Sequence, residues 1–171
     1  MKIKNPFQRL GSFVCAAGIL MMAANPLRAD EKTWAGTADA SWLTGGNWSP
    51  SALATDVDSV LWDISSTTNL SQTLDQNWTV TGLRVSDAPG AITVLSGAGN
   101  FVLTNAGGID LSAAAADLTI LADYRSLNNS TLNVAAATTL TFSNTVAGLT
   151  TATPMYGNGT VRILGTAQRT D

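Results

Sequence analysis

Short segments of alternating apolar and polar residues recur along the chain, and most begin eight or nine residues after the one before. The segments are residues 83–85, 92–94, 101–103, 109–111, 118–120, 132–134 and 140–142. Turn-forming Gly, Asn and Pro and runs of small residues lie between them. Because successive side chains of a strand point to opposite faces, each segment has one apolar face. The sequence therefore predicts an all-β fold of very short strands.

Two architectures accommodate such strands, a β-sandwich and a β-solenoid in which about three short strands make one coil. We favour a solenoid of the right-handed parallel β-helix-like kind, because a sandwich usually has longer strands. Residues 127–160 carry no charge, but their β-branched and apolar residues indicate that the strands continue there. A flexible Thr/Ser/Ala stalk is the alternative for this stretch.

All five tryptophans lie between Thr33 and Trp78. The end of a solenoid must be covered, because it otherwise exposes unpaired backbone and apolar side chains. We therefore predict that residues 30–79 form a tryptophan-rich N-terminal cap and residues 80–171 the repeat region, together one folded domain. A different hypothesis is that Trp34, Trp42 and Trp48 are exposed and stack against sugar rings.

The first 29 residues have the layout of a secretory signal peptide. Lys2, Lys4 and Arg9 precede an apolar run of 14 residues at 11–24, and Asn25-Pro26 precedes the small residue Ala29. The run is shorter than the roughly 20 residues that a membrane-spanning helix needs. We therefore predict cleavage after Ala29, export through the inner membrane, and an extracellular or outer cell-surface location with no integral membrane segment in the mature chain.

Charge and composition restrict the partners that the chain can bind and the catalytic or metal sites that it can form. After Ala29 the chain has twelve acidic and five basic residues, a net charge of −7, which disfavours nucleic acid as a partner. There is no histidine, Glu31 is the only glutamate, and Cys15 is the only cysteine. The usual nucleophile–base pairs and zinc ligand sets cannot be built from the remaining residues. We therefore predict no catalytic residues and no required cofactor.

Two alternatives to this prediction, a Ca²⁺ or sugar site and a glycan-degrading active site, would use aspartates. In a strand, Asp56 and Asp58 would share a face, where their carboxylates could bind Ca²⁺ or contact a sugar. An aspartate-based glycan-degrading enzyme is the weaker alternative, since it needs two carboxyl groups facing each other across a groove.

The tryptophan-rich segment resembles the N-terminal start of bacterial proteins with autotransporter-associated β-strand repeats. The residues that carry the resemblance are Trp34-Ala35-Gly36, Ser41-Trp42, Asn47-Trp48-Ser49 and the strand from Asp56 to Trp62. The match extends over residues 33–165, although only Gly157–Gly165 looks like the glycine-bounded unit that such proteins repeat. The resemblance implies an extracellular, passenger-like β-helical segment for display or adhesion, and it implies no catalytic residues. The partner that we expect is an extracellular glycan or a cell-surface matrix.

Overall fold

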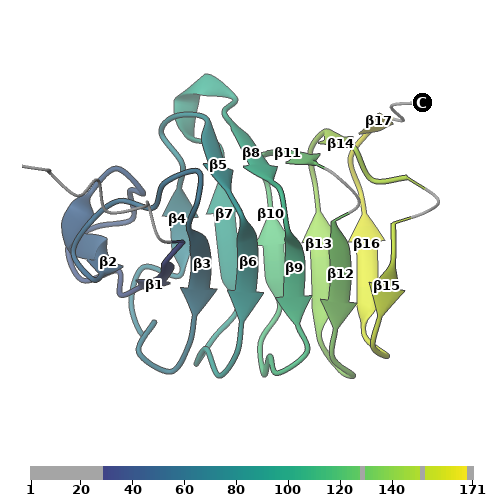
Figure 1. The fold of residues 1–171 in the computed structure, drawn as a ribbon, viewed down its shortest axis with the longest axis horizontal. Coiled ribbons are helices and arrows are strands. Elements are labelled where there is room, and N and C mark those ends of the chain that lie inside the picture. Colours follow the sequence, from purple (N-terminus) through teal and green to yellow (C-terminus); the bar gives the residue numbers. More distant parts are fainter. Residues whose placement is uncertain (1–28, 128–129, 151–152, 169–171) are drawn as a thin grey trace, which may run out of the picture.

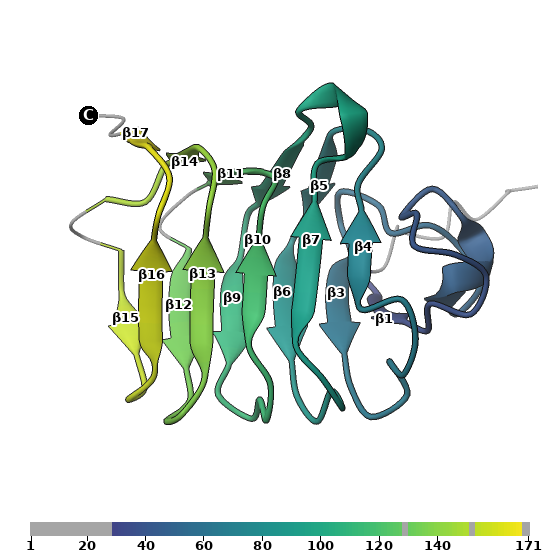
Figure 2. The same ribbon diagram turned by 180° about the vertical axis from the view of Figure 1, so that it is seen from behind.

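The computed structural model describes residues 29–127, 130–150 and 153–168. The predicted signal peptide lies outside these residues except for Ala29, which is exposed. The described chain winds into a β-solenoid of about five turns (Figure 1), which confirms the solenoid and excludes the sandwich. Seen from both sides (Figures 1 and 2), the coils wind right-handed from the N-terminal to the C-terminal end.

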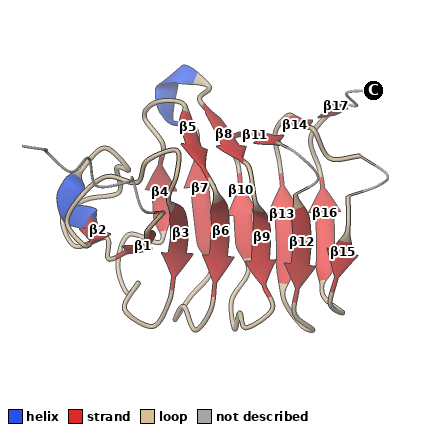
Figure 3. Ribbon diagram, viewed as in Figure 1, coloured by secondary structure: helices blue, strands red, loops and turns tan. Residues whose placement is uncertain are grey.

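Each coil contributes one short strand to each of three sheets. Sheet A contains, in spatial order, β15 (Met155–Tyr156), β12 (Thr131–Val134), β9 (Gly108–Leu111), β6 (Gly82–Val85), β3 (Ser59–Trp62), β1 (Glu31–Trp34) and β2 (Trp48–Ser49). Sheet B contains β16 (Thr160–Ile163), β13 (Thr139–Phe142), β10 (Leu118–Ile120), β7 (Ile92–Leu95) and β4 (Ser71–Thr73). Sheet C contains β17 (Ala167–Gln168), β14 (Val146–Ala147), β11 (Asp123–Ser126), β8 (Val102–Asn105) and β5 (Trp78–Val80). Two 3-10 turns, η1 (Gly45–Asn47) and η2 (Gly97–Gly99), complete the elements (Figure 3).

Parallel pairing stacks equivalent residues of successive coils on top of one another. On sheet B, Leu118 pairs with Ile92 on one side and with Leu140 on the other, and all three side chains are fully buried. Across the three sheets the paired residues of neighbouring coils are 21 to 26 positions apart. The apolar residues of the alternating strands therefore point inward and together form a single continuous core.

The strand predicted at residues 101–103 begins one residue later, at Val102, and extends to Asn105. Leu103 and Asn105 both point inward, and Asn105 is fully buried. Its side-chain oxygen accepts the backbone N–H groups of Gly107 and Gly108, and its amide donates to the Gly108 carbonyl and to the Tyr124 hydroxyl. An asparagine replaces an apolar residue at this position because it holds the turn into β9.

The glycine at position 108 is required by the same turn. Its φ is +115°, which side-chain-bearing residues rarely adopt, and a Cβ there would collide with the backbone oxygen of Thr131 in the next coil. The corner between sheets C and A is therefore specified by both Asn105 and Gly108.

Aspartates at other corners bond to the coil that follows. Asp117 accepts the Thr139 amide at 2.7 Å, and Asp123 accepts the Thr145 amide at 3.1 Å. Each carboxylate thereby satisfies a backbone donor just before or at the start of a strand, where the sheet pairing does not reach.

The N-terminal end of the stack is covered. β2 pairs antiparallel with β1, which lies against β3, so the chain folds back over the first coil of sheet A. At sheet B, the Thr73 amide donates to the Ala40 carbonyl, and the Trp42 amide donates to the Thr73 carbonyl. The predicted tryptophan-rich cap is thus confirmed, and all but the last residue of the first full coil, β3 to β5, belongs to the segment predicted as cap.

Candidate functional site

The tryptophans of the cap pack on one another rather than facing solvent. Trp34 and Trp42 are 0% exposed, and Trp48 is 1% exposed. The Trp34 and Trp48 rings meet edge to face with centroids 5.0 Å apart, and the Trp42 and Trp48 rings do so at 5.2 Å. The Trp42 ring also contacts Trp78 at 5.5 Å and Trp62 at 6.3 Å. The five side chains form one cluster, in which the Trp42–Trp62 contact is tilted and the other three contacts are edge to face, a geometry that aromatic rings favour.

Most indole N–H groups in the cluster have partners. Trp42 Nε1 donates to Gln72 Oε1 at 2.8 Å, Trp48 Nε1 to the Trp42 carbonyl at 3.0 Å, and Trp78 Nε1 to the Leu74 carbonyl at 2.8 Å. Stacking of a sugar needs an open ring face, and the faces of Trp34, Trp42 and Trp48 are occupied by protein. The structure therefore does not place these three rings in an exposed platform.

Asn47 fixes the loop that crosses over the cluster. It is fully buried, its oxygen accepts the backbone amides of Ala38 and Asp39, and its amide donates to the Asp39 carboxylate and the Ser41 carbonyl. Hydrogen bonds from the Ser41 backbone, the Thr44 hydroxyl and the Asn47 amide lower the pKa of Asp39. The Asn-Trp-Ser motif noted in the sequence therefore combines a loop anchor with a core tryptophan.

Asp56 and Asp58 do not share a strand face. They lie in a turn ahead of β3, in which the Asp58 amide donates to the Thr55 carbonyl at 3.0 Å. Asp56 is exposed, whereas Asp58 is buried and accepts the Asp30 amide on one oxygen and the Thr55 amide and hydroxyl on the other. The predicted Ca²⁺ pair required Asp56 and Asp58 to lie on one face of a strand, and in this turn they do not. Within the described residues no group of three or more His, Cys, Asp or Glu side chains could hold a metal ion.

The Asp58 carboxylate should make stability depend on pH. Burial would raise the pKa of Asp58, but its hydrogen bonds to Asp30 and Thr55, with the charge of Lys32, outweigh that effect and lower the pKa from 3.8. The ionised group therefore adds stability above that ordinary value, and the contribution is lost as the pH falls toward the lower folded pKa. We expect the stability difference between wild type and Asp58→Asn to shrink over this acidic range in urea denaturation. A difference that is constant with pH would contradict this role.

A groove that the sequence did not reveal runs along the outer face of sheet C. It has a volume of about 550 Å³ and crosses successive coils from Asn77, just before β5, to Gln168 on β17. Polar and apolar atoms line it about equally, and its polar residues are Asn77, Thr104, Asp123, Arg125, Thr145 and Gln168. Thr104, Arg125, Ala147 and Gln168 follow one another in register, one from each coil. Residues more than twenty positions apart thus make one surface, so no local motif announces it.

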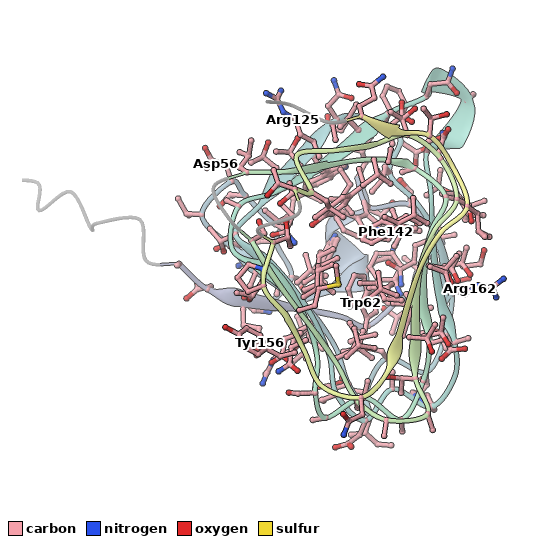
Figure 4. The ribbon with its side chains drawn as sticks, turned by 90° about the vertical axis from the view of Figure 1, so that its right-hand side faces the viewer. Asp56, Trp62, Arg125, Phe142, Tyr156 and Arg162 are labelled. Atoms are coloured by element: carbon pink, nitrogen blue, oxygen red, sulfur yellow. The ribbon has the colours of Figure 1, made fainter. Side chains whose placement is uncertain are left out.

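The view down the solenoid axis separates core from surface (Figure 4). Trp62 and Phe142 lie inside the coils, whereas Asp56, Arg125, Tyr156 and Arg162 project from the outside. Arg125 thus extends from the sheet C side, where the groove lies.

In the described part of the chain, no helix has the length and apolar character needed to cross a membrane. No protein-family model, curated protein or solved structure matches the chain. What the chain does must therefore be inferred from its own residues.

Proposed function

We propose that the chain is a non-catalytic structural module of a passenger-like protein, exported by its N-terminal signal and used for display or adhesion outside the cell. The observation that carries this proposal is the buried tryptophan cluster that closes the first end of a parallel coil stack. Such a cap stabilises an extracellular β-stack that has no cysteine after position 15 to form disulfides.

The outer face of sheet B supports the same proposal. Its outward residues stack in register as Ser71, Thr93, Thr119, Thr141 and Arg162. A row of short hydroxyl side chains is uncharged over four coils and leaves a flat, hydrated surface. A surface of this kind suits an exposed spacer or display element.

Carbohydrate binding is a second candidate function, and the groove on sheet C is the observation that favours it. Its volume lies in the range of about 300–1,000 Å³ that is usual for ligand sites. The Arg125 guanidinium and the Gln168 and Asn77 amides offer donors to sugar hydroxyls. Because the groove runs across the coils, it suits an extended chain better than a single sugar.

Tryptophan fluorescence and calorimetry of the purified chain distinguish the two functions. For the structural module we expect blue-shifted emission, because all five rings are buried, and no response to Ca²⁺ or to a panel of soluble polysaccharides. Saturable heat with one polysaccharide, lost in Arg125→Ala but kept in Arg162→Ala on sheet B, would establish the groove as a binding site and contradict the purely structural function. An emission shift on adding a sugar would contradict the buried cap itself.

A further inference from the structure

The C-terminal end of the described stack differs from the N-terminal end, because no described strand covers it. β15, β16 and β17 each pair with the preceding coil through β12, β13 and β14. On their other side they have no strand partner among the described residues. Three strand edges are therefore open at the same end of the molecule (Figure 1).

Apolar side chains that belong to the core are exposed at this end. Met155 pairs with the buried Leu132, and Ile163 pairs with the buried Phe142, so both point inward. They are nevertheless 63% and 43% exposed, because no described strand packs on their outer side. Together with Val161 and Ala167 they surround a depression of about 330 Å³ whose lining is mostly apolar. Open strand edges beside exposed apolar side chains are a typical site of protein association.

Because the N-terminal end is covered, it restricts which end of a second copy can bind at the open C-terminal end. Head-to-tail stacking would require the outer edges of β3 and β4 in the second copy, but β1 and the segment around Ala40–Trp42 already occupy them. At the open end of a second copy, no described strand occupies the edges of β15, β16 and β17. Two open ends related by a two-fold axis perpendicular to the solenoid would meet with their edge strands antiparallel, which strands accept readily.

Size and charge are compatible with such a contact. A four-residue strand spans roughly 13 Å, so the end of a three-stranded coil offers on the order of 500 Å² per copy, close to the lower limit for a specific interface. Arg162 is the only charged residue described in the last coil, from Thr153 to Gln168, and it points outward. No like charges are therefore forced together at the centre of the contact.

We propose that two copies of the chain associate tail to tail through β15 and β16, which buries Met155, Val161 and Ile163 across a two-fold axis. Because the other end of each copy is capped, the assembly closes as a dimer and does not extend into a fibre.

Light scattering coupled to size exclusion of the purified full chain tests this dimer. We expect twice the monomer mass for wild type and for the outward control Arg162→Asp. Ile163→Asp, on the same strand but facing inward, should raise the dimer dissociation constant by roughly 30-fold or more, as expected for a central interface residue. All five tryptophans lie at or before position 78, so unchanged blue-shifted emission shows that the cap of each variant remains folded.

Hydrogen exchange of the wild-type chain provides a test that needs no substitution. Amides of β15 and β16 should exchange more slowly at high than at low protein concentration, while those of β6 and β7 in the middle of the stack should not change. A monomeric wild type, or a dimer that Ile163→Asp leaves intact with no concentration-dependent protection of β15 and β16, would overturn the proposal.

Discussion

Replacing Trp42 with alanine should lower the free energy of unfolding by about 3–5 kcal/mol, the range found for large buried aromatic residues. Trp42 is fully buried and contacts the rings of Trp48, Trp62 and Trp78. The substitution would open a cavity at the centre of the cap and leave Gln72 Oε1 without the indole N–H that it accepts at 2.8 Å. Urea or guanidinium denaturation, followed by circular dichroism, measures the effect.

Leu43→Ala is the matched control, because the neighbouring Leu43 is 43% exposed. We expect it to change stability by no more than about 0.5 kcal/mol. If Trp42→Ala proved as mild as this control, the cluster would not be the element that stabilises the first coil.

Asn105→Ala should cost about 3 kcal/mol, because the side chain is fully buried and makes four hydrogen bonds. Its loss leaves the amides of Gly107 and Gly108 without acceptors inside the turn between sheets C and A. The Tyr124 hydroxyl, a group whose pKa is raised because it is buried, would lose the Asn105 amide as donor.

Asn133→Ala is the matched control, because it removes the same side-chain amide at a position outside the turn. Asn133 lies on β12 and pairs with Asp110 and Tyr156 on the outer face of sheet A, where it is half-buried. A change within about 0.5 kcal/mol is expected at such a surface position. Equal destabilisation by both substitutions would show that the turn at 105–108 does not depend on its asparagine.

The sequence allowed the solenoid to be predicted where strands have apolar residues at both inward positions. β10 is an example, with Leu118 and Ile120 inward and Thr119 outward. β11 was not predicted, because its inward residues are Tyr124 and Ser126, and the string Asp-Tyr-Arg-Ser has little apolar alternation. The two-residue strands β14 and β17 are too short to show any period.

The cap could be predicted because five tryptophans gather ahead of the repeats and an open solenoid end needs a cover. The pairing of Asp56 with Asp58 was wrong in its geometry, since a turn at Thr55–Asp58 interrupts the strand that the alternation suggested. The groove on sheet C and the open end at β15 to β17 arise only when coils stack, because their residues come from different turns of the chain.

Coils differ in length, but their strands pair in the same way. The corner between β7 and β8 comprises residues 96–101 and includes η2, whereas the equivalent corner between β10 and β11 is only Leu121 and Ala122. β7 and β10, like β8 and β11, nevertheless pair residue for residue. Extra residues at this corner loop outward and leave the core contacts in place. Foreign peptides grafted at 97–99 should accordingly be tolerated, which makes this corner a point where new recognition loops can be exchanged on an unaltered frame.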